Sequence, residues 1–194
     1  MPERTPSQTV GPYLHLALAP ADYNFRPLVG STVAEPGLPG THIRIEGRLS
    51  DGEGNVLPDA LIEIWQADAE GRYAHPADGR ALRSNSFRGF GRAATDAAGG
   101  FAFATVKPGA VPGPDGSLQA PHINVGIFAR GLLKRLITRI YFAGEAGNAS
   151  DPILALVPAD RRHTLMAEPD AARPGLFRFD IRLQGRDETV FFDA

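Results

Sequence analysis

The chain has 194 residues and no cysteine. Without thiolates, histidine and tyrosine are the side chains to consider first as ligands of a metal ion. Among the five histidines, only His122 combines a predicted strand with a distinctive setting, in the segment APHIN. Residues two apart on a strand share a face. A second histidine at position 124 would therefore give the imidazole pair that a metal ion needs. The residue there is Asn124, whose amide is a poor metal ligand, so a half-buried, hydrogen-bonded His122 is the simpler interpretation.

Tyr73 is the second candidate, in the segment GRYAH that follows a predicted strand. A tyrosinate can bind a hard ferric ion, so Tyr73 and His122 could both be iron ligands. Two ligands without a third and a fourth hold iron poorly. A loop tyrosine that packs over the sheet is the simpler interpretation of this residue as well.

Several other classes of function are excluded by what the sequence lacks. No Gly-x-Ser-x-Gly elbow, P-loop or GxGxxG turn is present. The lack of cysteine excludes disulfide scaffolds, thiolate zinc sites and iron–sulfur clusters. The chain carries 20 basic and 22 acidic residues, a net charge of -2, without a basic patch for nucleic acid or an anionic membrane. Without a run of 18 apolar residues or a signal-peptide pattern at MPER, we expect a cytoplasmic protein.

The elements that must position these residues are predicted to be strands. Apolar and polar residues alternate with period two, and 22 glycines and 17 prolines mark turns between the alternating segments. The predicted strands span residues 42–49, 61–66, 101–105, 122–128, 136–142 and 177–183. This spacing is typical of an all-β fold, a β-sandwich, rather than of a parallel sheet.

Three segments do not follow the strand pattern. Residues 67–100 form a long loop, which is usually functional or part of an interface in a compact domain. Residues 151–168 predict one or two short helices, interrupted at Pro158. Residues 1–40 are rich in proline and form an irregular N-terminal arm. We therefore expect one domain over residues 1–194, with the β-sandwich core in residues 41–194.

Six segments, in this order, resemble the intradiol ring-cleavage dioxygenases. The resemblance is strongest to the protocatechuate-cleaving members, which are built from alpha and beta chains, and among these to the alpha chains. It covers almost the whole chain. The matching segments are TPSQTVGPY at 5–13, IEIWQADAEGRY at 62–73, TVKPG at 105–109, APHIN at 120–124, TRIYF at 138–142 and FRFDIRLQG at 177–185.

The resemblance implies that iron is held by a partner chain. In the family's iron-bearing chain, two tyrosines and two histidines bind Fe(III), and Tyr73 and His122 match one residue of each pair. Val111 stands where the second tyrosine is expected, and Asn124 stands where the second histidine is expected. We therefore expect no metal in this chain, and Fe(III) in a beta chain. Tyr73 and His122 would remain in a vestigial pocket, hydrogen-bonded to each other.

The resemblance also implies a role for this chain in the partner's substrate pocket. The expected lining residues are Thr9, Gly11, Pro12 and Tyr13 of the arm, together with Arg130 in the segment FARG. Arg130 would offer a fixed positive charge to a carboxylate. The implied reaction is the O2-dependent intradiol cleavage of 3,4-dihydroxybenzoate (protocatechuate) to 3-carboxy-cis,cis-muconate, in a large hetero-oligomer of alpha–beta pairs.

Two alternatives remain open at this point. The chain could be a non-enzymatic β-sandwich binding module, since a DGEG hairpin followed by LIEIW also occurs in such modules. The extent of the matches beyond that hairpin argues against it. The chain could also be a self-sufficient homo-oligomeric dioxygenase, against which Val111 and Asn124 stand as evidence.

Overall fold

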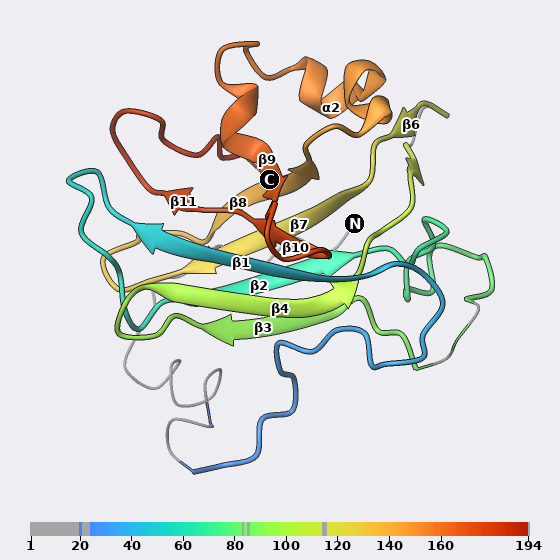
Figure 1. The fold of residues 1–194 in the computed structure, drawn as a ribbon, viewed down its shortest axis with the longest axis horizontal. Helices are drawn as coiled ribbons and strands as arrows, with labels where there is room; N and C mark the ends of the chain where they lie inside the picture. Colours follow the sequence, from blue (N-terminus) through green and yellow to red (C-terminus); the bar gives the residue numbers. More distant parts are fainter. Residues whose placement is uncertain (1–19, 21–23, 83, 85, 114–115, 194) are drawn as a thin grey trace, which may run out of the picture.

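The computed structural model describes residue 20 and residues 24–82, 84, 86–113 and 116–193. Most strands run side by side across the molecule, with short helices gathered at one edge (Figure 1). One layer contains β1 (His42–Ser50), β4 (Gly100–Val106), β10 (Leu176–Arg178) and β11 (Ile181–Arg182). The other contains β2 (Leu61–Gln66), β3 (Phe90–Ala94), β7 (His122–Phe128) and β8 (Leu136–Phe142). The prediction of an all-β fold is confirmed.

The two layers are joined by β9 (Met166–Pro169). This strand pairs antiparallel with β10 and parallel with β8, so a nearly closed path of strands runs from β1 to β3. The core lies between the layers, where alternate residues of β1, such as Ile43 and Ile45, meet alternate residues of β2 and β7, such as Ile62 and Ile123. Period-two burial of these side chains stabilises both layers.

The short helices are η2 (Ala146–Ser150), α2 (Pro152–Ala155) and η3 (Arg162–Leu165). Of these, α2 and η3 lie in the predicted segment 151–168, on either side of Pro158, whereas η2 precedes that segment and was not predicted. Asp151 begins α2 as its N-cap, and Pro152 follows at the position where a helix tolerates proline. In the part of the chain that the structure describes, no helix is long and apolar enough to span a bilayer.

The C-terminal strand segment differs from its prediction, because β10 and β11 are separated by Phe179 and Asp180. The Phe179 N–H donates to the Glu46 carbonyl at 2.9 Å, and the Phe179 carbonyl lies against Gly47. A Cβ at position 47 would collide with that carbonyl oxygen. The interruption therefore depends on a glycine in the neighbouring strand, which alternation within residues 177–183 cannot reveal.

Three further differences concern short strands. The predicted loop at 67–100 contains β3, and β9 was not predicted. Residues 111–119 contain a small ladder in which β5 (Val111–Pro112) pairs with β6 (Leu118–Gln119). Part of the expected N-terminal arm is tied to this chain's own sheet, because the Ser31 carbonyl accepts from Ala104 and the Val33 N–H donates to Ala104.

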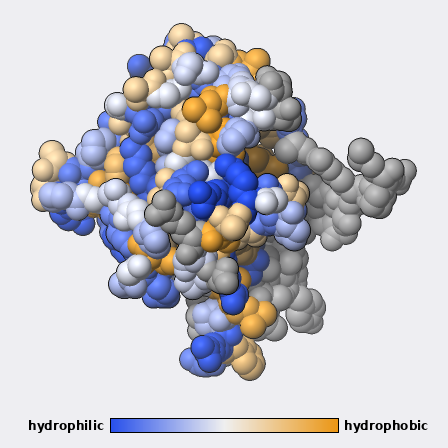
Figure 2. Space-filling model, turned by 90° about the vertical axis from the view of Figure 1, so that its right-hand side faces the viewer, coloured by the Kyte–Doolittle hydropathy of each residue, from blue (hydrophilic) through white to orange (hydrophobic). Residues whose placement is uncertain are grey.

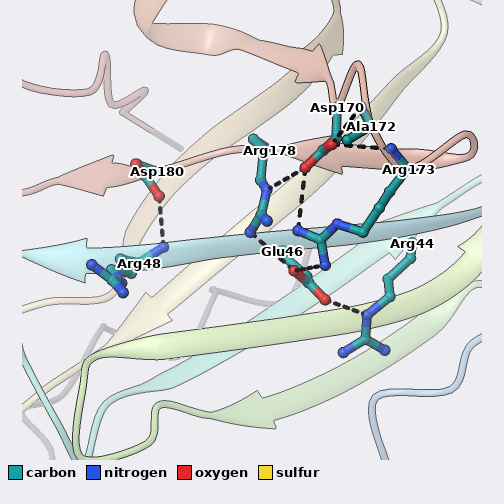
Figure 3. Close-up of polar contacts among 8 residues, drawn as sticks. All are labelled: Arg44, Glu46, Arg48, Asp170, Ala172, Arg173, Arg178 and Asp180. Atoms are coloured by element: carbon teal, nitrogen blue, oxygen red, sulfur yellow. Dashed lines mark hydrogen bonds and ion pairs between the residues drawn. The ribbon is translucent and has the colours of Figure 1, made fainter.

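An ion-pair network covers the outer face of β1 and β10 (Figure 3). Glu46 accepts from Arg44 at 2.6 Å and from Arg178 at 2.9 Å, and Asp170 accepts from Arg173 and Arg178. These groups are partly exposed, so each pair contributes about 1 kcal/mol or less. The network adds to the backbone pairing that already fixes Glu46 opposite Arg178.

A buried polar cluster fixes the start of β7. The Asp151 carboxylate is fully buried and accepts from the backbone N–H of Ala120 at 2.7 Å and from the Tyr141 hydroxyl at 3.1 Å. The same carboxylate accepts the N–H groups of Ile153 and Leu154, which begin α2. One side chain therefore holds three segments together.

His122 follows Ala120 by two residues and is 1% exposed. Its Nδ1 lies 2.8 Å from the Ala120 carbonyl oxygen. Burial, together with the nearby charge of Arg139, lowers the pKa of His122 to about 4. The imidazole is therefore neutral at pH 7, with the proton on Nδ1 as the tautomer that satisfies the Ala120 carbonyl.

We predict that Asp151→Asn lowers the free energy of unfolding by about 2–4 kcal/mol, since an amide cannot accept from all four donors. Urea unfolding followed by circular dichroism measures this loss. Asp193→Asn is the matched control, because the Asp193 side chain is 95% exposed and pairs with the exposed Lys134. A loss for Asp151→Asn as small as that of the control would contradict the proposed role of this carboxylate.

We also predict a pH dependence that belongs to His122. Since its pKa is lower in the folded chain than the ordinary histidine value of 6.5, its stabilising contribution is present above about pH 6.5. It is lost as the pH falls toward about 4, with an upper limit of about 3 kcal/mol. Unfolding of wild type and His122→Gln should be compared across this range, with the exposed His163→Gln as control. Equal slopes for wild type and His122→Gln would show that the prediction is wrong.

Candidate functional site

Tyr73 lies in a tight turn after β2 that is organised by Asp68. The Asp68 carboxylate accepts the backbone N–H groups of Glu70 and Arg72, each at 2.9 Å. Gly71 adopts a positive φ of 75°, which a glycine adopts without strain. The GRY sequence therefore folds back on the end of β2 and directs the chain toward the outer face of the sheet.

Two further contacts hold Tyr73 in place. Its backbone N–H donates to the Asp78 carboxylate at 2.7 Å, and its ring stacks on Trp65 with 5.7 Å between ring centroids. Arg80 donates to both oxygens of Asp78 and to the Gly71 carbonyl. The hydrogen bond from Arg80 is the main cause that lowers the pKa of Asp78 to about 2. The Asp78 carboxylate is therefore ionised at neutral pH, where it holds both Arg80 and the backbone of Tyr73.

The segment that carries Val111 packs directly on this turn. The Gly109 N–H donates to the Asp68 carbonyl at 2.9 Å, and a Cβ at Gly71 would collide with the carbonyl oxygen of Ala110. Val111 itself is buried and pairs with Gln119 in the β5–β6 ladder. The close backbone approach brings the GRY turn and the KPGAV segment together, although 38 positions separate Tyr73 from Val111 in the sequence.

His122 and Asn124 lie near the start of β7, the strand between β2 and β8. Asn124 pairs with Trp65 of β2 and with Arg139 of β8, so these three residues form a row across the sheet. The Asn124 amide donates to the Tyr73 hydroxyl at 3.5 Å. The prediction that Tyr73 bonds to His122 is therefore wrong: the neighbour of its hydroxyl is Asn124, and His122 bonds to a backbone carbonyl instead.

Arg139 connects these residues. Its guanidinium Nη1 donates to the Gln119 side-chain oxygen at 2.7 Å and lies 3.4 Å from the Tyr141 hydroxyl. The positions predicted to be vestigial are thus connected. Tyr73 contacts Asn124, and Val111 pairs with Gln119, which bonds to Arg139. The His122 ring lies 5.9 Å from the ring of Tyr141, whose hydroxyl Arg139 contacts.

Burial keeps the phenols of this group neutral. It is the main cause that raises the pKa of Tyr73, which Arg139 and Asn124 offset in part, and it raises the pKa of Tyr141 to about 12. Both hydroxyls are therefore protonated at pH 7 and act as hydrogen-bonding groups rather than as anionic ligands.

These residues do not fit a ferric site. Iron(III) prefers anionic oxygen ligands, and of the four positions Tyr73 alone could supply one; His122 adds an imidazole, while Asn124 and Val111 offer an amide and an aliphatic side chain. A positively charged guanidinium lies among them. Within the described ranges, no cluster of three or more His, Cys, Asp or Glu residues could hold a metal ion.

Arg130 lies apart from this group. It follows the opposite end of β7 from His122, about 20 Å away at the rise of a β-strand. Its guanidinium forms an ion pair with Asp59 at 2.8 Å, and its side chain is 77% exposed. Gly131, with a φ of 86°, forms the turn. The remaining expected lining residues, Thr9, Gly11, Pro12 and Tyr13, lie outside the described residues.

Sequence reasoning missed the part played by Arg139. Its segment TRIYF was noted only as part of a resemblance. The signal that could have found it is strand register: once β7 and β8 are paired as a hairpin, Arg139 falls opposite Asn124. The structural roles of Asp68 and Asp78 were also missed. In a sequence, an aspartate that accepts backbone N–H groups cannot be distinguished from any other loop aspartate.

Comparison with known proteins gives consistent matches. The Dioxygenase family matches residues 31–185. The protocatechuate 3,4-dioxygenase alpha chain of Burkholderia cepacia is 46% identical, over 99% of this chain and 98% of that protein. The beta chain from the same organism is 39% identical, over 77% of this chain and 67% of that protein.

Similarity in structure agrees with these matches. The dioxygenase domain of a carbohydrate-binding fusion protein from Streptomyces sp. SirexAA-E superimposes with a TM-score of 0.62 at 27% identity, covering 94% of this chain and 99% of that one. A family match over most of the chain and close relatives over nearly its full length lead to one conclusion. The chain belongs to the intradiol ring-cleavage dioxygenase family.

Proposed function

We propose that this chain is the alpha subunit of a protocatechuate 3,4-dioxygenase. It pairs with a beta chain in the cytoplasm, within a large hetero-oligomer of alpha–beta pairs. The complex cleaves 3,4-dihydroxybenzoate with O2 to give 3-carboxy-cis,cis-muconate. The observation that carries this proposal is the combination of near full-length similarity to alpha chains with a pocket whose residues do not fit iron.

Fe(III) held by the beta chain would supply the Lewis acidity that activates the catechol ring toward O2, both atoms of which would enter the product. The contribution of this chain is to bind and orient. Residues 1–194 act as one domain, whose N-terminal arm supplies Thr9, Gly11, Pro12 and Tyr13 to the partner's pocket. A glycine in that segment allows the backbone to approach a flat aromatic ring closely.

Arg130 is the residue that we assign to the substrate carboxylate. Two features support this assignment. Its guanidinium is mostly exposed, with Asp59 on one side, so several of its five N–H donors face outward. It also lies at the far end of β7 from the vestigial group, where it cannot serve this chain's own pocket and is available to a partner's.

The proposal is tested first by iron content and substrate-dependent oxygen uptake. The full chain produced alone is expected to carry no stoichiometric iron and to consume no oxygen with protocatechuate. The same chain co-produced with an iron-bearing beta chain should give a purified complex with about one iron per alpha–beta pair and with turnover. Stoichiometric iron and turnover in the isolated chain, or failure to form any complex, would overturn the proposal.

The role of Arg130 predicts a specific kinetic effect. In the complex, Arg130→Ala should raise KM for protocatechuate about 10- to 100-fold, because a charge-assisted hydrogen bond is lost. Unsubstituted catechol, which lacks the carboxylate, should show no such change. Arg186→Ala is the matched control, since the Arg186 side chain is 94% exposed and pairs weakly with Asp187, at 3.9 Å. An equal effect of Arg130→Ala on both substrates would remove Arg130 from carboxylate binding.

A further inference from the structure

Asp59 and Arg130 lie opposite each other at the end of the sheet where β2 begins and β7 ends. The outermost pair of the β2–β7 ladder is Leu61 with Phe128, and one step of two residues further out on each antiparallel strand leads to Asp59 and Arg130. This is the left-hand end of the sheet in Figure 1, away from the side that Figure 2 shows. The Arg130 Nη2 lies 2.8 Å from the Asp59 Oδ2. Strand register therefore places the two charges together.

The turn that carries Asp59 is held by Thr95, which is 6% exposed. The Thr95 hydroxyl accepts from the Ala60 N–H and donates to the Leu57 carbonyl, each at 2.8 Å. The backbone N–H of Thr95 also donates to the Ala60 carbonyl at 2.8 Å. One buried threonine therefore fixes both ends of the turn at residues 57–60.

The backbone of Asp59 adopts a conformation that favours glycine. Its φ is 70°, and Pro58 precedes it. Proline followed by a residue of positive φ is the pattern of a type II turn, in which the second of these positions prefers glycine or asparagine. An aspartate there costs backbone free energy relative to glycine. The contribution of its carboxylate is therefore the feature to explain.

Arg130 lies in a second turn, at residues 129–132. The Leu132 N–H donates to the Ala129 carbonyl at 3.2 Å, and Gly131 has a φ of 86°. The backbone of Arg130 is therefore fixed, whereas its long side chain is 77% exposed. An exposed arginine side chain samples many rotamers, and ordering it when a ligand binds costs entropy. A carboxylate held beside the guanidinium reduces that cost.

The ion pair leaves part of the Arg130 guanidinium available to a ligand. A guanidinium carries five N–H donors in a planar fork, and the contact with Asp59 is made by Nη2. A second carboxylate can approach another edge of the fork, with the positive charge between it and Asp59. Asp59 can therefore order the guanidinium without occupying all of its donors.

We propose that Asp59 is a positioning residue for substrate binding, because its carboxylate holds the Arg130 guanidinium in the orientation that receives the carboxylate of the substrate. This inference rests on the proposed function, in which Arg130 binds that carboxylate in the complex with a beta chain. Asp59 does not contact the substrate and acts through Arg130. Its effect is therefore confined to substrates that carry a carboxylate.

The test compares Asp59→Asn and Asp59→Gly with wild type in the purified alpha–beta complex. Asparagine and glycine both adopt a positive φ readily, so the turn is retained while the charge is lost. Each variant should raise KM for protocatechuate about three- to fivefold, the effect of an exposed ion pair, and leave kcat unchanged. KM for unsubstituted catechol should not change. Urea unfolding should show no loss of stability, which separates positioning from a structural role.

Two controls accompany these variants. Asp187→Gly removes another aspartate of positive φ, 58°, whose side chain is 62% exposed, and should leave KM unchanged. Asp59→Asn added to Arg130→Ala should have no further effect on KM, because the guanidinium through which Asp59 acts is then absent.

The outcomes separate this inference from the proposed function. If Arg130→Ala raises KM for protocatechuate whereas Asp59→Asn leaves it unchanged or lowers it, the positioning role is wrong and the proposed function stands. If Arg130→Ala also leaves KM unchanged, the assignment of Arg130 is wrong and this inference fails with it. An equal rise in KM for catechol, an additive effect in the double variant, or loss of the complex on Asp59→Asn would also overturn the positioning role.

Discussion

The hydrogen bonding of β7 between β2 and β8 is the constraint on which the rest of the structure depends. Its first residues carry His122 and Asn124, and its register sets which side chains of the neighbouring strands they meet. Its last residues lead into the turn that exposes Arg130. A single strand therefore separates the group around His122 and Asn124 from a charged surface residue by about 20 Å. Both features would be lost by a slip of one residue, which would move each side chain to the opposite face.

The polar side chains around Tyr73 and His122 are stabilised by hydrogen bonds to one another and to the backbone. The Asn124 amide meets the Tyr73 hydroxyl, Gln119 meets Arg139, and the proton on His122 Nδ1 meets the Ala120 carbonyl. Buried polar groups are costly unless each finds a partner. Each of these polar groups has a partner in the structure. The turn that carries Tyr73 is held by the carboxylates of Asp68 and Asp78, which accept its backbone N–H groups.

Much of the fold was predictable from alternation. Residues 61–66, 122–128 and 136–142 match β2, β7 and β8, because their inward residues are buried in one continuous core. The strand at 177–183 was predicted as unbroken, since its interruption depends on Gly47 in another strand. The short strands β3 and β9 were not predicted, because their own residues show no clear alternation of apolar and polar side chains. They are strands because they pair with β2 and β8.

The residues of the pocket were predictable only in part. Tyr73, Val111, His122 and Asn124 were identified from the resemblance, and the structure brings them into one group. The contact of Tyr73 with Asn124 and the position of Arg139 depend on strand register, which the sequence alone did not give. Arg130 was identified in the same way, and its carboxylate-binding role stays a prediction.

The central claim is that this chain binds no iron and contributes to a pocket whose iron belongs to its partner. Anomalous diffraction at the iron edge, from crystals of the alpha–beta complex with bound protocatechuate, tests it most directly. The account predicts iron peaks only in the beta chain, with the substrate carboxylate within hydrogen-bonding distance of Arg130. An iron peak beside Tyr73 and His122 would contradict it.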